Sequence, residues 1–472
     1  MRKRKERKGG TSFNKSRRLE EEEEEEEEEE LTKSKLSCVP HPYNVFPLGN
    51  KYLDGNYEED ERRRMEGLGN FTLLQDEFLV EILFKLSFVD VVSVMKTSRY
   101  LYLFATLEDV WRKLVFKEFG HLFKQNNFIP NPLFLHSYRI TFARCFLHSK
   151  TNLKQTSLQE GEEKEGKKER KEDLFLCDAP PLPSFQQNKH YSDSIYNRWF
   201  CSNASLSPFF LNTQDNLQRI QYYPTGAETR ELREEKVEEK VREKMRERKP
   251  FVLRGGTQGW PANEKWKFEQ LVSSFPSFPF KTDKAGEEEK DEENLEITLP
   301  NYLSFASQIK DKNPLYIFDD MKSEGVKRMK EDYKVLPFFN DLFSSLLPPT
   351  QRPPDYQWII IGCEASGSPF HKDPLSTSAW NALIIGKKKW IFFPPHLIPP
   401  GCFPGKDEWD ISTPDSAVEY FIDRSIFSFF LLLFILTFFV TRYQDVEKMR
   451  KRGEEVYECI QSEGEIGLLQ IF

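Results

Sequence analysis

Residues 357–395 read QWIIIGCEASGSPFHKDPLSTSAWNALIIGKKKWIFFPP, and this stretch decides the fold. It consists of short β-branched and aromatic runs bounded by glycine and proline, a pattern typical of sandwiches and barrels. Runs of the same kind come earlier, as KPFVLRGG at 249–256, PLYIFDD at 314–320 and DYKVLPFF at 332–339. The C-terminal half of the chain is therefore predicted to form a jelly roll.

The quoted stretch contains one H-x-D motif, His371-Lys372-Asp373. On a strand, side chains two residues apart share one face, so His371 and Asp373 could reach the same cation. A 2-His-1-carboxylate site for Fe(II) combines such a pair with a distant second histidine and leaves coordination positions open. The motif alone is weak evidence, and its sequence context carries the prediction.

That context, HKDPLSTSAWNALIIGKKKWIFFPP at 371–395, resembles the JmjC oxygenases of the Jumonji-domain-containing protein 6 type. The runs at 249–256, 314–320 and 332–339 resemble the same family in the same order. The resemblance covers roughly residues 190–400 once charged inserts are removed. It implies a cupin-type double-stranded β-helix that uses Fe(II) and 2-oxoglutarate.

The resemblance also implies which residues hold these cofactors. His371 and Asp373 would ligate Fe(II). Asn381 and Lys388 would hold 2-oxoglutarate, because an ammonium group supplies the point charge that its distal carboxylate needs and an amide can orient the other end.

Two hydroxyl residues, Ser368 and Tyr316, would line the co-substrate pocket by the same resemblance. Both Tyr316 and Lys388 also have an alternative interpretation without a ligand. Tyr316 would then be a core residue with its hydroxyl hydrogen-bonded, and Lys388 would be one of three lysines in a turn. Trp380 and Trp390 are predicted to be core residues.

The third iron ligand of the family lies on a late strand, in a run like GE-x-x-F-V-P-x-x-W-W-H. Residues 458–465 match the approach to that strand, but IGLLQIF follows and contains no histidine. After Asp373 only His396 is left, beside two prolines where the family has no ligand. We therefore expect the third histidine ligand to be missing, the closing strands of the barrel to be absent, and oxygenase activity to be poor or lost.

Residues 71–120 have apolar side chains at helical spacing and predict a bundle of short amphipathic helices over 68–120. The order L-x-D-E-x-L-x-E-I-L, S-R-x-L-Y and V-W-R-K-L resembles an F-box, which docks on a Skp1-type adaptor of a ubiquitin ligase. The alternative is an ordinary helical bundle without that partner. The resemblance assigns adaptor contacts to Leu74, Leu79, Ile82, Leu83, Leu101 and Trp111.

Charged segments separate these regions. Opposite charges at helical spacing favour a helix over residues 228–248. Its apolar stripe is too thin for a core, so we expect this helix to be exposed to solvent. We predict an α+β protein with charged disordered inserts. Its regions are a low-complexity disordered tail (1–66), the F-box-like bundle (68–120), a linker region with a charged insert (121–189) and a C-terminally incomplete jelly-roll domain (190–472). The inserts of the jelly-roll domain lie near residues 226–248, 284–294 and 425–441.

Residues 425–441, SIFSFFLLLFILTFFVT, form an uncharged run at the short limit of a membrane span. Because the run interrupts a domain, translated intron sequence is the favoured interpretation, ahead of a membrane anchor or a buried helix. A membrane location is not expected.

The N-terminus begins MRKRKERKGG and has no apolar signal region behind it. This basic segment predicts a nuclear location, with cytoplasm also allowed, and the alternative is a solvated tail. Beyond it the sequence contains no clear nucleic-acid-binding module. Seven cysteines without a C-x-x-C pair argue against a disulfide framework or a zinc module.

The resemblance to the JmjC oxygenases implies an oxygenase that hydroxylates lysine or removes methyl groups from arginine, as histone demethylases do. The acidic charge blocks suit a basic or chromatin-associated protein substrate. The alternative is a non-catalytic F-box adaptor that brings targets to a Skp1-type ubiquitin ligase.

Overall fold

The fold is described by a computed structural model of the chain. It covers residues 40–52, 57–124, 137–159, 185, 187–204, 213–222, 230–283, 295–339, 346–348, 357–373, 377–405, 411–413, 416–421 and 442–469. The predicted membrane or intron segment, the insert at 284–294 and the charged part of the linker at 160–184 lie outside these residues.

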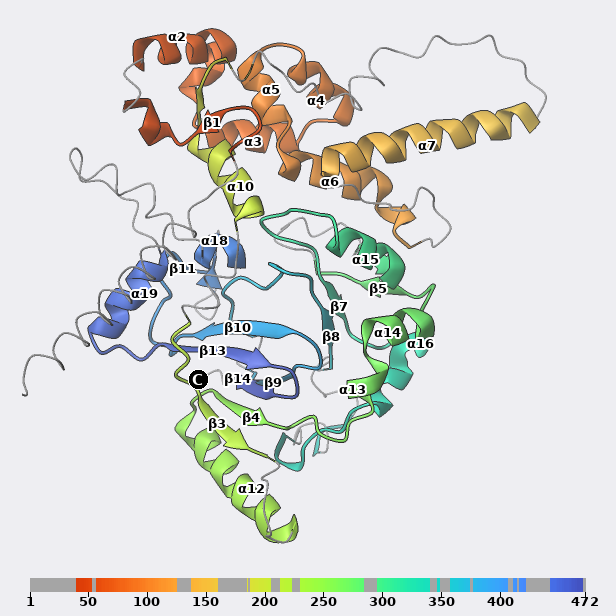
Figure 1. Ribbon diagram of the computed structural model, residues 1–472, viewed down its shortest axis with the longest axis vertical. Coiled ribbons are helices and arrows are strands. Elements are labelled where there is room, and N and C mark those ends of the chain that lie inside the picture. Colours follow the sequence, from red (N-terminus) through yellow and green to blue (C-terminus); the bar gives the residue numbers. More distant parts are fainter. Residues whose placement is uncertain are drawn as a thin grey trace, which may run out of the picture.

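The N-terminal half forms a helical layer, and Figure 1 shows it above the strands with α10 between the two. Serine side chains cap two of its helices, since Ser87 accepts from the Asp90 backbone N–H and Ser98 from that of Leu101. The elements of this layer are η1 (Leu48–Tyr52), α2 (Tyr57–Leu68), η2 (Gly69–Leu73), α3 (Asp76–Phe84), α4 (Phe88–Met95), α5 (Arg99–Ala105), α6 (Glu108–Phe119), η3 (Gly120–Leu122), α7 (Tyr138–Gln159) and α10 (Asp193–Asn203).

The predicted bundle over 68–120 is present, but the sequence placed its boundaries too narrowly. Strand β1 (Val45–Phe46) pairs in parallel with β2 (His190–Tyr191), and Val45 is buried. The assignment of residues 1–66 to a disordered tail is therefore wrong for 40–52 and 57–66. Helix α7 packs on α6 and buries Phe142, so the region predicted as a linker starts with a folded helix.

Not all of the predicted adaptor contacts lie on the surface of the bundle. Leu79, Leu83 and Trp111 are buried in the core, and the Trp111 indole donates to the Ala105 carbonyl at 2.8 Å. They stabilise the bundle and cannot contact a partner, because the apolar face of each short helix packs against the neighbouring helices. Leu101 is half-buried, and Leu74 and Ile82 are exposed.

The C-terminal half contains short strands joined by helical and irregular segments. The strands are β3 (Gln218–Gln221), β4 (Phe251–Arg254), β5 (Pro279–Lys281), β6 (Glu296–Thr298), β7 (Ile317–Asp319), β8 (Ile359–Ile361), β9 (Ala379–Ala382), β10 (Lys387–Phe392), β11 (Phe403–Pro404), β12 (Ile411–Ser412), β13 (Tyr457–Ser462) and β14 (Ile466–Leu469). The helices are α12 (Arg230–Glu247), α13 (Ala262–Lys265), α14 (Phe268–Ser274), α15 (Leu299–Ala306), α16 (Glu324–Lys327), η4 (Arg328–Glu331), η5 (Pro337–Phe339), α18 (Ala417–Phe421) and α19 (Arg442–Lys451).

The largest sheet has the order β3-β4-β14-β9, with β3 parallel to β4 and the other pairs antiparallel. Strand β10 pairs with β13, β7 with β8, β5 with β6 and β11 with β12. Strand β13 lies in the segment predicted as the approach to the late strand, and the residues after it form a further strand, so the expectation that the closing strands are absent is wrong for β14. Both come from the last residues described, and β14 occupies an interior position of the sheet.

Helix α12 corrects a second expectation about the charged inserts. Its apolar stripe is thin, as the sequence indicates, yet Val237 and Val241 are buried against Phe251, Leu253 and the other apolar residues of the β3-β4-β14-β9 sheet. A narrow stripe is enough because the sheet supplies the rest of the apolar surface. Residues 230–247 are therefore a structural helix of the domain.

The helical layer and the β5–β8 region share one hydrophobic core. A continuous cluster of buried side chains runs from Trp111 and Phe142 in the helices to Phe280 and Ile317 in the strands. Backbone contacts reinforce it, since the Thr298 N–H donates to the Phe123 carbonyl at 3.1 Å. The two predicted domains thus pack as one body in the described part of the chain.

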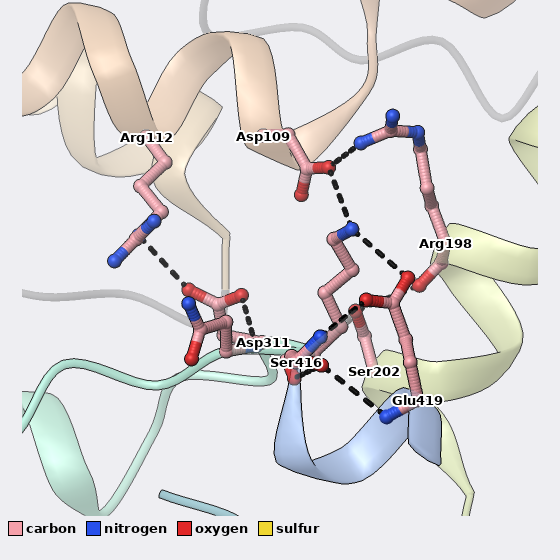
Figure 2. A network of polar contacts seen from close by, with 9 residues as sticks. Asp109, Arg112, Arg198, Ser202, Asp311, Ser416 and Glu419 are labelled. Carbon is pink, nitrogen blue, oxygen red and sulfur yellow. Dashed lines mark hydrogen bonds and ion pairs between the residues drawn. The ribbon is translucent and has the colours of Figure 1, made fainter. Parts of the chain in front are cut away.

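Polar contacts also join the two halves (Figure 2). Asp109 of α6 pairs with Arg198 of α10, and Lys312 lies 3.0 Å from Glu419 of α18 and 3.8 Å from Asp109. Asp311 accepts from the buried Tyr138 hydroxyl at 2.7 Å. Among the residues described, no helix is long and apolar enough to cross a membrane.

A buried ion triad fixes α19 to the strands. Glu458 of β13 is fully buried and contacts Lys389 at 2.7 Å and Arg450 at 2.6 Å. Replacing Glu458 by Gln removes the buried charge that pairs with Lys389 and Arg450, of which Arg450 keeps Glu447, so we expect the free energy of unfolding to fall by about 3–5 kcal/mol. Urea unfolding measures this loss.

The matched control for this substitution is Glu455→Gln on the same segment, because the Glu455–Lys249 pair is exposed and contributes little. Equal stability of the Glu458 and Glu455 variants would contradict the structural role of the triad.

Candidate functional site

The H-x-D motif lies in an irregular segment between β8 and β9, so its predicted location on a strand is wrong. The two side chains nevertheless meet, with His371 Nε2 at 3.5 Å from Asp373 Oδ1. His371 Nδ1 lies 2.8 Å from the Pro369 carbonyl oxygen. The hydrogen bond to Asp373 is the main reason that the pKa of His371 is raised. Imidazole nitrogen and carboxylate oxygen are both donors that suit Fe(II).

Contacts of Phe370 hold this segment in place. The Phe370 ring packs against Tyr420 of α18, with ring centroids 4.7 Å apart, and against Phe393. The Thr413 hydroxyl donates to the Phe370 carbonyl at 2.7 Å. The position of His371 therefore depends on α18 and on the segment before it.

Tyr316 and Ser368 meet as the resemblance predicts. Tyr316 directly precedes β7, and its hydroxyl lies 2.9 Å from Ser368 Oγ. Burial raises the pKa of Tyr316, so the phenol stays protonated and can donate a hydrogen bond. Because Ser368 is three residues from His371, this hydroxyl pair belongs to the same segment as the metal-binding motif.

Asn381 on β9 and Lys388 on β10 also lie together, with Lys388 Nζ 3.4 Å from Asn381 Oδ1. Burial lowers the pKa of Lys388 to about 8, and no carboxylate of the described residues offsets this effect. A buried ammonium group without a counter-ion is costly unless an anion joins it. The pair therefore fits a carboxylate ligand such as 2-oxoglutarate.

Gln461 on β13 is a residue of the site that the sequence analysis missed. It is fully buried, and its amide donates to the Asn381 carbonyl at 2.8 Å and to the Glu465 carbonyl at 2.9 Å. Its carbonyl accepts from the Trp390 indole at 2.8 Å. Strand β13 (YECIQS) also contains Glu458 and Ser462, so its sequence contained no signal that singled out Gln461.

The two tryptophans differ from simple core residues. Trp390 is half-buried, hydrogen-bonded, and lies under Lys388 with Nζ 5.6 Å from the ring centroid. Trp380 is also half-buried and packs against the sheet cluster that contains Trp260. Each packs against a buried cluster of the strands, so the prediction of a core role holds in part for both tryptophans.

The metal half of the site is less complete than the co-substrate half. Within the described ranges, no group of three or more His, Cys, Asp or Glu side chains could hold a metal ion. His371 and Asp373 are two donors, and His396 is exposed. Fe(II) fits these donors in chemistry but lacks a third protein ligand among them, whereas the Lys388–Asn381 pair offers 2-oxoglutarate a cation and an amide.

Comparison with known proteins agrees with this chemistry. A family model described as a cupin-like domain matches residues 237–420. The chain is 32% identical over 392 residues to arginine-specific demethylase JMJ22 of Arabidopsis thaliana, which covers 83% of this chain and 66% of that protein.

Two further relatives match shorter regions. One is the bifunctional arginine demethylase and lysyl-hydroxylase psr-1 of Caenorhabditis elegans, 37% identical over 148 residues, or 31% of this chain and 36% of that protein. The other is the 2-oxoglutarate and iron-dependent oxygenase JMJD4 of Mus musculus, 26% identical over 155 residues, or 29% of this chain and 36% of that protein. This chain thus carries a cupin-like domain and is similar to JmjC proteins named as iron- and 2-oxoglutarate-dependent oxygenases and demethylases, of whose length it spans two thirds or less.

Proposed function

We propose that this chain is an Fe(II)- and 2-oxoglutarate-dependent oxygenase of protein side chains, which hydroxylates lysine or removes methyl groups from arginine. The observation that carries the proposal is the half-buried side chain of Lys388, whose ammonium group has an amide beside it and no carboxylate partner in the described part of the chain. Relatives named as arginine demethylases and a lysyl hydroxylase support the choice of reactions.

Each group of the site has a role in this proposal. The Lys388 ammonium pairs with the distal carboxylate of 2-oxoglutarate, and Asn381, fixed by Gln461, orients the other end. Tyr316, hydrogen-bonded to Ser368, would supply a hydroxyl donor beside the metal-binding segment. Bound iron and 2-oxoglutarate supply O2-dependent hydroxylation, with release of succinate and CO2.

Iron binding is the weak point of the proposed activity. His371 and Asp373 supply two donors, and a third is not found among the described residues. We therefore propose that iron is bound weakly and that turnover by this chain is low. The basic segment at residues 2–18 supports a nuclear location, and the acidic blocks, such as Glu20–Glu30, support a basic or chromatin-associated protein substrate.

A second candidate function is that of an F-box adaptor, supported by an exposed apolar surface on the helical layer. Phe71, Leu74, Phe78 and Ile82, which we call the α3 surface, are exposed, with Phe78 at 58% and Ile82 at 41%. Soluble proteins rarely leave several large apolar side chains of one helix in water unless a partner covers them. A Skp1-type adaptor is the partner we propose, and this role is compatible with catalysis.

Removing the charge of Lys388 tests the co-substrate site. We expect Lys388→Met to weaken 2-oxoglutarate binding by about tenfold or more, because the ligand carboxylate loses its only buried cation. Isothermal titration with Mn(II) in place of iron measures the affinity. Lys387→Met, an exposed neighbour on the same strand, is the matched control and should bind normally.

The same titration has a pH dependence. Because burial lowers the pKa of Lys388 to about 8, the ammonium form is lost as the pH rises through that value. Binding to the unmodified chain should therefore weaken above pH 8, and binding to Lys388→Met should be much less sensitive. Equal 2-oxoglutarate affinities of the unmodified chain, Lys388→Met and Lys387→Met would refute the assignment of Lys388 to the co-substrate site.

The metal site is tested by replacing His371. His371→Ala should lower Mn(II) affinity by about tenfold or more, since one of two protein donors is removed. His396→Ala should leave it unchanged. Electron paramagnetic resonance counts bound Mn(II), and added imidazole should strengthen binding to the unmodified chain by acting as a third donor. If only His396→Ala lost Mn(II) affinity, the metal would bind at a site other than His371 and Asp373.

The adaptor candidate predicts a partner contact through the α3 surface. A purified Skp1-type adaptor should co-elute with the chain in gel filtration. The double substitution Phe78→Glu and Ile82→Glu should abolish this complex, because it places two charges on the apolar contact. Met245→Glu on α12 is the control. A complex that survives the double substitution would exclude this surface.

A further inference from the structure

Helix α18 lies between the helical layer and the metal-binding segment, although it holds none of the predicted ligands. It begins with a reciprocal cap, in which the Ser416 N–H donates to Glu419 Oε2 at 2.9 Å and the Glu419 N–H donates to Ser416 Oγ at 3.2 Å. A helix of only five residues is not stable alone, because its first turn fixes several residues for one hydrogen bond. The position of α18 must therefore come from contacts with its neighbours.

Lys312 provides the contact that joins α18 to the helical layer. Its ammonium group lies 3.0 Å from Glu419 Oε1 and 3.8 Å from Asp109 Oδ2 of α6. Its backbone carbonyl accepts from the Ser416 hydroxyl at 2.9 Å. Figure 2 shows Asp109 and Glu419 approaching each other from these two helices. All three charged side chains are at most 18% exposed, so one cation bridges two largely buried carboxylates from different parts of the fold.

The residue after Glu419 connects α18 to the metal-binding segment. The Tyr420 ring is buried and packs edge-on against Phe370, with ring centroids 4.7 Å apart and planes at 72°. Phe370 directly precedes His371, which is exposed and belongs to no strand. The packing of Phe370 on α18 therefore limits how far His371 can move.

We infer that Lys312 is a positioning residue of the metal site, which acts through Glu419 and Tyr420 on the segment that carries His371. The inference rests on the proposed oxygenase function and deepens it. Two protein donors hold a metal ion weakly, so the affinity depends on how often they are already arranged together when the ion arrives. Removing the Lys312 charge takes a cation away from the largely buried Glu419 carboxylate, and this carboxylate can then regain solvation only if α18 moves.

The co-substrate half of the site should depend much less on this contact. Asn381 lies on β9, which pairs with β14, and Lys388 lies on β10, which pairs with β13 along its whole length. Backbone hydrogen bonds hold these strands whether or not α18 shifts. A selective loss in the metal half therefore distinguishes a positioning role of Lys312 from a general loss of stability.

Mn(II) binding by the full chain tests the inference, with electron paramagnetic resonance as the readout. Lys312→Met should weaken Mn(II) binding by about fivefold or more. Lys312→Arg should retain most of the affinity, because it keeps the cation. Lys310→Met, at an exposed lysine of the same segment, is the matched control. At saturating Mn(II), 2-oxoglutarate affinity should be nearly the same in all these proteins.

A second measurement needs no metal. Trypsin cleavage after Lys372, followed by mass spectrometry, reports the mobility of the metal-binding segment, and cleavage after Lys387 of β10 is the reference. Lys312→Met should raise the ratio of the two rates by about fivefold or more, because cleavage follows the population of open states. Tyr420→Leu removes the ring contact, leaves the charges intact and should raise the ratio likewise.

An unchanged cleavage ratio in Lys312→Met, or an equal change in Lys310→Met, would overturn the inference. Circular dichroism shows whether each variant is folded, and if Lys312→Met is not, an unchanged ratio in folded Tyr420→Leu overturns it instead. A raised ratio in a chain that binds no Mn(II) would defeat the oxygenase proposal and leave the positioning role standing. Mn(II) binding that is equally tight in the unmodified chain and Lys312→Met would defeat the positioning role alone.

Discussion

The need to pair buried charges between the helical layer and the strands constrains the whole molecule. Lys312 lies between Asp109 of α6 and Glu419 of α18, and all three side chains are largely withdrawn from water (Figure 2). Burial alone would raise the pKa of Asp109, but Lys312 and Arg198 lower it. Charges in such surroundings are tolerated only when partners meet them, so α6, α10 and α18 must sit together.

This constraint reaches the candidate site through α18. Glu419 is held by Lys312, and the next residue, Tyr420, packs on Phe370 beside His371. The helical layer therefore helps to position the metal-binding segment, although it contributes no ligand. This explains physically why the two regions share a core and do not behave as domains joined by a linker.

Local sequence patterns predicted the helices over 76–119 and the short strands around residues 317 and 390. The family resemblance, and not a local pattern, assigned the site residues that the structure brings into pairs, namely His371 with Asp373, Tyr316 with Ser368 and Asn381 with Lys388. Neither could predict Gln461, because its role depends on partners far away in the chain. The same reason explains α12, whose two valines look too few until the sheet beneath them is known. Periodicity describes one element, whereas burial depends on its neighbours.

The two halves of the site are built by different parts of the fold. Asn381 and Lys388 are fixed by β9, β10 and β13, where Gln461 satisfies a backbone carbonyl and an indole at once. His371 and Asp373 lie in an irregular segment whose support comes from side-chain packing against α18. A regular hydrogen-bonded sheet resists displacement better than a packed loop, since each strand is held by several bonds. The co-substrate half is therefore preorganised by the fold, whereas the geometry of the metal half depends on the contact between the helical layer and α18.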